Sequence, residues 1–308
     1  MSTIERAAAQ GNGEEPPTPT PRPARKSEPV HSLEERISSR RRPLAGRCDF
    51  DIDAMAARGF LSPKEGRSQL AREMRRMKRP LLLNIRKAEA LLGRPSAETG
   101  PKDMRSHNFI MVTSALPGEG KTYTSTNLAI SIAAEIDRSA LLVDADVAKR
   151  DLSRQFDLTG DRGLTEALAD SSVHPDAFTL ATNVDRLELL PSGTSRDNID
   201  ELYASVTMQR RMRSLSRLDP NRVVVFDGPP LLVTTEAKVL AQYMSQILLV
   251  VESGKTPQDA VLHALKLLEE HPNVSVVLNK TSRPLGSDYG YGYGCGYGYG
   301  QTEEEAAR

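Results

Sequence analysis

Residues 108–122 read NFIMVTSALPGEGKT and combine the residue types that a phosphate-binding turn requires. The apolar beginning of this stretch predicts a buried strand, its Gly- and Pro-rich centre predicts a turn, and a helix is expected from Lys121 onward. Backbone N–H groups at such a helix start converge on an anion, and the helix dipole adds positive potential there. Gly118 and Gly120 lack a Cβ, so the backbone can bend sharply and approach phosphate oxygens closely.

Two side chains at the end of this turn have the chemistry of a nucleotide site. Lys121 supplies a positive charge for β and γ phosphates, and Thr122 supplies a hydroxyl for Mg²⁺. The candidate phosphate cradle consists of Ala115, Pro117, Gly118, Glu119, Gly120, Lys121, Thr122 and Tyr123. The pattern GxxxxGK[ST] has glycine where this chain has Ala115, but the expected order of strand, turn and helix supports the site. A Gly-containing surface turn that precedes a lysine is the alternative interpretation.

Three carboxylates follow apolar runs that are typical of buried parallel strands. Asp144 and Asp146 end the run ALLVDAD, and Asp227 follows the apolar residues of RVVVFDGPP. Ligands of open α/β sheets lie at the carboxyl ends of the strands, so we expect all three side chains beside the phosphate turn. Asp146 and Asp227 are expected to hold Mg²⁺ directly or through water, together with the Thr122 hydroxyl.

The elements that must position these groups alternate along the chain. We expect strands at residues 140–146, 187–190, 222–230, 246–252 and 274–279, and helices at residues 122–136, 199–218 and 257–271. Strands that alternate with helices predict an α/β fold, with a mostly parallel sheet covered by helices on both faces.

Residues 62–93 also show a helical pattern, and Pro80 is expected to divide it into two helices. Glu73, Arg76 and Arg79 recur at intervals of three residues, which places them on one helix face. On that face a glutamate of one subunit could meet an arginine of a neighbour. A solvated charged face is the alternative interpretation.

The composition suggests three regions. Residues 1–60 are rich in Pro and charge and are expected to be disordered, because they offer too little apolar area to offset the entropy of ordering. Residues 61–286 form the expected folded domain, with residues 61–93 as its N-terminal helices. Residues 287–308 form the expected flexible tail.

The overall charge excludes some function classes. The chain has 41 basic and 41 acidic residues, so its net charge gives no drive toward nucleic acid. Its two cysteines, Cys48 and Cys295, do not suggest a disulfide framework. No apolar run reaches the roughly 18 residues of a membrane span, and the start of the chain lacks the apolar core of a secretory signal. We therefore expect a cytoplasmic protein that reaches a membrane only through a partner or a surface patch.

The tail reads SDYGYGYGCGYGYGQTEEEAAR and alternates Gly with Tyr. Glycine raises the entropy cost of ordering, so flexible coil is expected rather than a strand. Its phenol groups belong to Tyr289, Tyr291, Tyr293, Tyr297 and Tyr299. Phenols on a mobile tether would be a substrate at high effective concentration. A self-associating aromatic segment and a peptide for a partner's groove are the alternatives.

From about Glu73 to the tail, the chain resembles the bacterial tyrosine kinases of exopolysaccharide and capsule synthesis. VTSALPGEGKT resembles the family's Walker A motif, LLVDAD its Walker A′ motif and VVVFDGPP its Walker B motif, while EMRRMKR matches its ExxRxxR subunit-contact pattern. The EMRRMKRPLLLN run and the Gly-Tyr tail are most similar to the exosortase-associated subgroup of these autokinases. Ala148 and Arg150 stand where the family often has Arg and then Pro.

The resemblance implies a P-loop NTPase fold and a protein-tyrosine autokinase that uses ATP and Mg²⁺. The γ-phosphoryl group would pass to the tail of a neighbouring subunit, with Asp144 orienting or deprotonating the phenol and Asn279 near the adenine. The implied partners are further copies in a ring such as an octamer, a separate membrane-spanning activator that regulates polysaccharide chain length and export, and a tyrosine phosphatase. The kinase would then lie at the inner face of the cytoplasmic membrane through its partner, and no nucleic acid is expected.

The sequence is also compatible with two other classes of protein. A positioning ATPase, like the ParA- and MinD-type relatives in partitioning and cell division, would hydrolyse ATP without phosphorylating tyrosine. Those relatives carry a second signature lysine early in the turn, where this chain has Leu116 and Pro117. A non-catalytic scaffold would bind nucleotide and use its tail for assembly.

Overall fold

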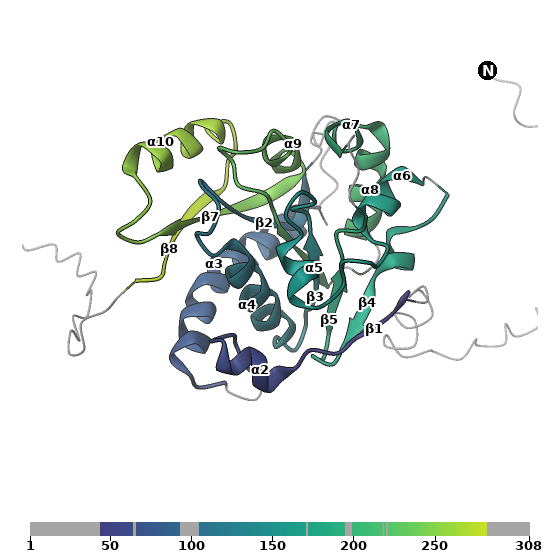
Figure 1. Cartoon of the computed structure of the whole chain (residues 1–308), viewed down its shortest axis with the longest axis horizontal. Coiled ribbons are helices and arrows are strands. Elements are labelled where there is room, and N and C mark those ends of the chain that lie inside the picture. The colour runs from purple at the N-terminus through teal and green to yellow at the C-terminus, as the bar shows by residue number, and fades with distance from the viewer. Residues whose placement is uncertain are drawn as a thin grey trace, which may run out of the picture. The chain divides into compact units, whose positions relative to one another are not determined.

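The computed structural model describes residues 44–63, 66–92, 105–170, 172–194, 199–217, 219 and 221–281. The strands are β1 (Gly46–Cys48), β2 (Ser106–Ser114), β3 (Ser139–Asp144), β4 (Leu180–Thr182), β5 (Leu187–Leu190), β6 (Arg222–Asp227), β7 (Met244–Glu252) and β8 (Val274–Asn279). Within the described residues they form one eight-stranded sheet in the order β1-β4-β5-β3-β6-β2-β7-β8 (Figure 1). Neighbouring strands are parallel except for β4 and β5, which are antiparallel. The predicted α/β fold with a mostly parallel sheet is confirmed.

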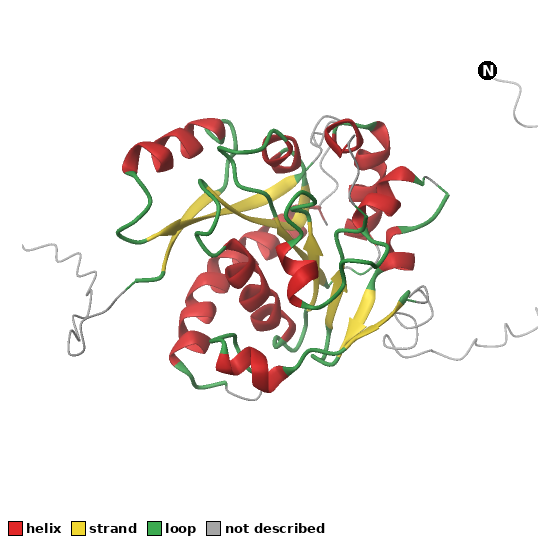
Figure 2. Cartoon of the chain, viewed as in Figure 1, coloured by secondary structure: helices red, strands yellow, loops and turns green. Residues whose placement is uncertain are grey.

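Helices cover both faces of the sheet (Figure 2). One face carries α2 (Ile52–Ala57), α3 (Gln69–Leu92) and α4 (Lys121–Ala133), and the other carries α6 (Leu164–Ala169), α7 (Ile199–Tyr203), α8 (Val206–Arg217), α9 (Glu236–Ala241) and α10 (Gln258–Leu267). The short helix α5 (Asp151–Gln155) follows β3, and a 3₁₀ helix, η1 (Pro175–Phe178), precedes β4. Residues 199–218, predicted as one helix, thus contain the two helices α7 and α8.

The middle residues of the central strands are apolar because both faces of these strands are covered. In β2, Ile110 and Val112 belong to the core under α3 and α4, whereas Phe109 and Met111 belong to the core under α8 and α9. This alternation follows from the two-residue period of a strand. All four side chains are fully buried.

Pro80 lies inside α3, so the prediction of two helices divided at this residue is wrong. Met74 and Ile85, on opposite sides of the proline, are buried in the same core. In addition, Gln246 of β7 donates from Nε2 to the carbonyl oxygen of Leu81 at 3.1 Å. These contacts along the sheet stabilise a continuous helix, although proline removes one of its N–H donors.

Residues 44–60 also differ from the expectation, which extended disorder to residue 60. They contain β1 and α2, and β1 pairs with β4. Phe50 stacks on Phe156 with ring centroids 4.2 Å apart, and the side chain of Asn183 bonds both the N–H and the carbonyl oxygen of Phe50. The rest of the expected disordered segment and the five tail tyrosines lie outside the described residues.

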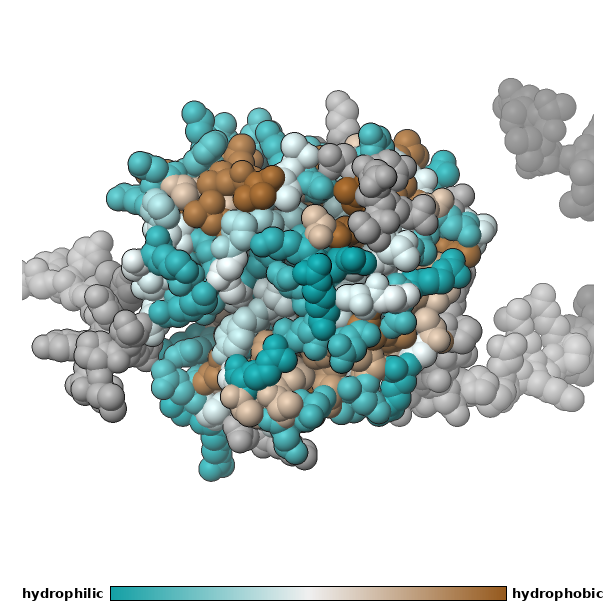
Figure 3. All heavy atoms as spheres, viewed as in Figure 1, coloured by the Kyte–Doolittle hydropathy of each residue, from teal (hydrophilic) through white to brown (hydrophobic). Residues whose placement is uncertain are grey.

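The surface of the domain is mainly hydrophilic on the face shown in Figure 3, which also has apolar areas near the position of α10. Leu262 of α10 is 55% exposed. In the part of the chain that the structure describes, every helix is too short or too polar to serve as a membrane span.

Candidate functional site

The Gly-rich turn connects β2 to α4, as the sequence predicts. Gly118 and Gly120 have φ angles of 86° and 99°, in the left-handed region that glycine adopts without strain. A Cβ on Gly120 would lie 2.0 Å from Nδ2 of Asn279. The turn therefore needs glycine at position 120 both for its backbone conformation and for the close approach of a neighbouring side chain.

The basic and acidic side chains predicted for the site meet at the end of this turn. Strands β3 and β6 pair with Asp144 opposite Asp227. Nζ of Lys121 lies 2.8 Å from Oδ2 of Asp146, and the Thr122 hydroxyl donates to Oδ2 of Asp227 at 2.7 Å. Lys121 is 4% exposed and each of the three aspartates is at most 1% exposed. The structure thus brings all five residues together in a nearly closed environment.

Burial shifts the protonation of this group. It raises the pKa of Asp227 to about 7, although the positive charge of Lys121 acts in the opposite direction. It also raises the pKa of Asp144 to about 6, against the hydrogen bonds from Ser153. For Lys121 burial lowers the pKa, but the charges of Asp227 and Asp146 more than compensate, so its pKa is raised. Both aspartates are therefore easier to protonate than ordinary aspartates, while Lys121 keeps its positive charge.

These carboxylates fit a divalent cation. Oδ1 of Asp227 is buried and has no hydrogen-bond partner among the described residues. Carboxylate and hydroxyl oxygens are the ligands that Mg²⁺ prefers, and Thr122 lies beside Asp227. The described residues contain no group of three or more His, Cys, Asp or Glu arranged to hold a metal ion. A cation here would therefore complete its shell with water and phosphate oxygens, as Mg²⁺ commonly does.

Residues behind the aspartates hold them in place, and no pattern in the sequence predicts these residues. Ser153 of α5 donates to Oδ2 of Asp144 from its N–H at 2.8 Å and from its hydroxyl at 2.6 Å. The buried Tyr203 of α7 donates to the carbonyl oxygen of Ala145 at 2.9 Å, and Ala145 donates to the carbonyl oxygen of Asp227 at 3.0 Å. A lone serine or tyrosine in a helix has no pattern that would reveal this role.

Not every residue of the predicted cradle faces the same way. The carboxylate of Glu119 is buried, accepts from the N–H of Leu116 at 2.6 Å and also accepts from the hydroxyl of Thr256. Pro117 is exposed, and the carbonyl oxygen of Ala115 accepts from the N–H of Leu232. The side chain of Glu119 thus stabilises the turn through these hydrogen bonds.

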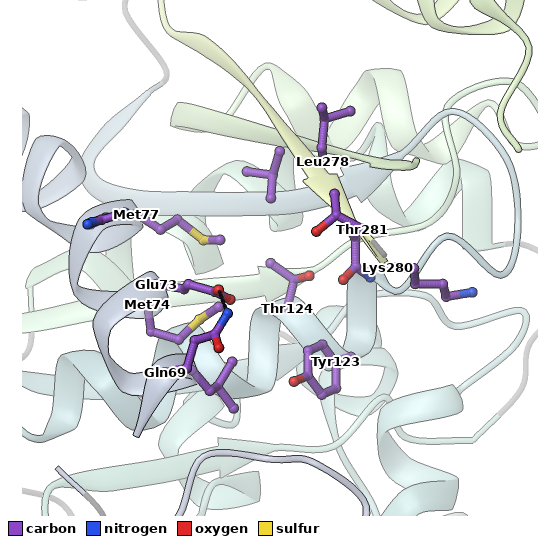
Figure 4. A pocket seen from close by; sticks show the side chains of 13 residues that line it. Gln69, Glu73, Met74, Met77, Tyr123, Thr124, Leu278, Lys280 and Thr281 are labelled. Atoms are coloured by element: carbon purple, nitrogen blue, oxygen red, sulfur yellow. Dashed lines mark hydrogen bonds between the residues drawn. The ribbon is translucent and has the colours of Figure 1, made fainter. Parts of the chain in front are cut away.

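A pocket of about 570 Å³ lies next to the turn, between α3, the start of α4 and the end of β8 (Figure 4). Glu73 and Arg76 line it from α3, and Tyr123 and Asn279 line it from the other side. Two predicted subunit-contact residues and two predicted nucleotide-binding residues therefore share one pocket. Arg79 is exposed and is not among the residues that line it.

A glycine turn between a buried strand and a helix, followed by lysine and threonine beside strand-end aspartates, defines a P-loop nucleotide-binding protein. No family model matches the sequence. The tyrosine-protein kinase YwqD of Bacillus subtilis is 31% identical over 226 residues, which cover 72% of this chain and 92% of the relative. The chain therefore belongs to the family of bacterial tyrosine-protein kinases.

Two further comparisons agree with this assignment. The solved kinase domain of the Escherichia coli tyrosine kinase ETK is 27% identical, with a TM-score of 0.50, over 68% of this chain and 79% of that domain. The succinoglycan biosynthesis transport protein ExoP of Rhizobium meliloti is 33% identical over 178 residues, which are 56% of this chain and 22% of the relative. The positioning-ATPase alternative is not favoured, because YwqD and ETK are both named as tyrosine kinases.

Proposed function

We propose that the chain is an ATP-dependent protein-tyrosine autokinase that phosphorylates its own Tyr-rich tail, in trans, within a homo-oligomer. The observation that carries this proposal is the convergence of Lys121, Thr122 and three strand-end aspartates at one buried site. A site that gathers a phosphate turn, a buried ammonium group and a spare carboxylate oxygen suits phosphoryl transfer, which depends on alignment and charge neutralisation.

In this scheme the phosphates of ATP lie on the turn from Ala115 to Thr122. Lys121 neutralises part of their charge. Mg²⁺, held by Thr122 and, directly or through water, by Asp146 and Asp227, would supply further charge neutralisation. Asn279 and Tyr123 line the pocket beside the turn, where the adenine would lie.

Asp144 would orient or deprotonate the acceptor tyrosine. The phenol oxygen bonds to the γ phosphorus while the bond from that phosphorus to the leaving ADP oxygen breaks, and the phenol proton passes to a carboxylate. A free phenol has a pKa of about 10, so a carboxylate that accepts its proton assists the attack at neutral pH. The pKa of Asp144 is about 6, so its carboxylate is mostly ionised at pH 7. This pKa is also closer to the pKa of the phenol than the pKa of an ordinary aspartate is.

The acceptors are Tyr289, Tyr291, Tyr293, Tyr297 and Tyr299 of a neighbouring subunit. Subunits meet through Glu73, Arg76 and Arg79 of α3, and the two arginines are exposed in the described chain. Each phosphate adds roughly 1.5 to 2 negative charges, so repulsion among phosphorylated tails favours dissociation.

The biological setting follows from the relatives. The name of the similar ExoP protein links this family to succinoglycan biosynthesis and transport, and we assign the chain to the regulation of exopolysaccharide or capsule polymerisation and export. A separate membrane-spanning activator brings the kinase to the inner face of the membrane, and a tyrosine phosphatase reverses the modification. Within the family, EMRRMKRPLLLN and the Gly-Tyr tail favour the exosortase-associated subgroup.

The direct test is to incubate the purified chain with Mg²⁺ and ATP and to map phosphorylated residues by mass spectrometry. We expect phosphate on the tail tyrosines, and none with EDTA or in Lys121→Met. Lys238→Met, which removes an exposed lysine of α9, is the matched control and should label normally.

Two further measurements make this test decisive. Loss of Lys121 leaves Asp146 buried without its cation, so thermal unfolding must show that Lys121→Met is folded. A variant with all five tail tyrosines changed to phenylalanine should bind ATP but incorporate no tail phosphate. Phosphotyrosine in folded Lys121→Met, or ATP hydrolysis by the wild type without any phosphotyrosine, would contradict the proposed function.

A further inference from the structure

We propose that Lys280 and Asn279, at the end of β8, are positioning residues that aim two backbone N–H groups of the phosphate turn at the nucleotide phosphates. This role rests on the proposed function and adds to it a pair of residues that determine how the turn binds phosphate. For Asn279, this positioning role differs from a contact with the adenine.

The two side chains hold consecutive carbonyl groups of the turn. Nζ of Lys280 donates to the carbonyl oxygen of Gly118 at 2.8 Å, and Nδ2 of Asn279 donates to that of Glu119 at 2.9 Å. Figure 4 shows Lys280 extending away from Met77 of α3. Lys280 therefore contacts the turn, although it is also among the residues that line the neighbouring pocket.

Fixing a carbonyl group also fixes the N–H group of the next residue. In a trans peptide the C=O and N–H bonds point in opposite directions, and the described residues contain no cis peptide. Because the carbonyl groups of Gly118 and Glu119 point toward β8, the N–H groups of Glu119 and Gly120 point away from it. Neither N–H group donates to another group of the described residues. They are therefore available to an anion on the turn.

Lys280 is itself held by a side chain at the end of the neighbouring strand β7. Lys280 lies 3.0 Å from Oε2 of Glu252, at the end of β7. The N–H of Glu252 donates to the hydroxyl of Thr256 at 3.1 Å, and that hydroxyl donates to the carboxylate of Glu119. The turn is thus tied to β7 and to β8 by separate bonds. A turn held in this way needs little reorganisation when it binds phosphate.

Gly120 is consistent with this arrangement. A side chain at that position would collide with Nδ2 of Asn279, the atom that holds the carbonyl of Glu119. The side chain of Asn279 therefore occupies the space beside Gly120.

The chain offers a matched pair of lysines for the experiment. Lys255 and Lys280 both pair with the carboxylate of Glu252, but only Lys280 reaches the turn. We would measure the binding of ADP, tripolyphosphate and adenosine to the full chain by calorimetry, for the wild type, Lys280→Met, Lys280→Arg and Lys255→Met.

Lys280→Met should weaken the binding of ADP and of tripolyphosphate about tenfold, which is the effect of losing one hydrogen bond to a charged group. Its affinity for adenosine and its melting temperature should stay at the wild-type values. Lys255→Met should bind all three ligands normally, and Lys280→Arg should recover most of the loss. Asn279→Ala should also weaken tripolyphosphate, although that ligand has no base to contact.

The opposite results would overturn the proposal. Equal effects of Lys280→Met and Lys255→Met on binding would mean that only the overall positive charge affects phosphate affinity. Unchanged tripolyphosphate binding in Asn279→Ala would show that Asn279 does not have this role. If the wild type binds ADP and tripolyphosphate and phosphorylates its tail while Lys280→Met binds equally well, this inference fails and the kinase assignment stands. If the wild type binds neither, the proposed function fails and this role fails with it.

Discussion

The hydroxyl of Tyr203 is expected to control the geometry of the two neighbouring aspartates. Tyr203 is 1% exposed, and its hydroxyl donates to the carbonyl oxygen of Ala145 at 2.9 Å. Ala145 stands between Asp144 and Asp146, so this one bond orients the backbone that carries both carboxylates. Tyr203→Phe removes the bond and keeps the ring.

The size of the effect follows from burial. The carbonyl oxygen of Ala145 would lose its donor in a place that water does not reach, since Ala145 is 1% exposed. Leaving a buried acceptor unsatisfied costs about 1–3 kcal/mol. In domains of roughly 150–250 residues, 1 kcal/mol corresponds to about 2–4 °C in melting temperature, so a middle value of about 2 kcal/mol predicts a fall of about 4–8 °C. A displaced catalytic group can cost about a hundredfold in rate, so tail phosphorylation should slow by about ten- to hundredfold.

The assay combines urea unfolding with initial rates of tail phosphorylation. Tyr243→Phe is the control, because Tyr243 is also buried but its hydroxyl donates to the carbonyl oxygen of Tyr203 at a weak 3.5 Å. We expect it to lose less than about 1 kcal/mol, with a normal rate. The reasoning is refuted if Tyr203→Phe and Tyr243→Phe are equally stable and equally active.

Two further predictions concern other parts of the fold. The hydrogen bond from Arg138 lowers the pKa of Glu89, so the stability that Glu89 contributes is complete above its unfolded pKa of about 4.3 and is lost as the pH falls through the folded value. Urea unfolding curves of the wild type and Glu89→Gln should therefore differ at pH 7 and converge toward pH 3; a constant difference would contradict this. Phe50→Ala should cost about 3–5 kcal/mol in the same assay, because Phe50 is buried against Phe156. No loss would mean that residues 44–60 contribute little to the fold.

The parts of the site that could be predicted are those encoded by local sequence. Gly118 and Gly120 mark a turn by their lack of a side chain, and the carboxylates follow short apolar runs that are typical of buried strands. A parallel sheet brings such strand ends to one edge, so the sequence predicts that Asp144 and Asp227 meet, and they are opposite each other in the pairing of β3 with β6. Backbone conformation and strand order carry this information without any knowledge of side-chain contacts.

The supporting residues could not be predicted because their roles depend on contacts between distant segments. Tyr203 follows Ala145 by 58 positions, and Lys280 follows Gly118 by 162. The prediction at Pro80 failed for a related reason: proline signals a helix end locally, whereas packing against β7 stabilises the helix through it.

The pairing of β1 with β4 has a consequence for the order of events during synthesis. Phe50 donates from its N–H to Asn183, which lies 133 positions later in the chain. At about 5–20 residues per second, the ribosome needs roughly 7–27 s to make the intervening chain. The earliest described strand must therefore wait, unpaired, while β2, β3 and β4 are translated.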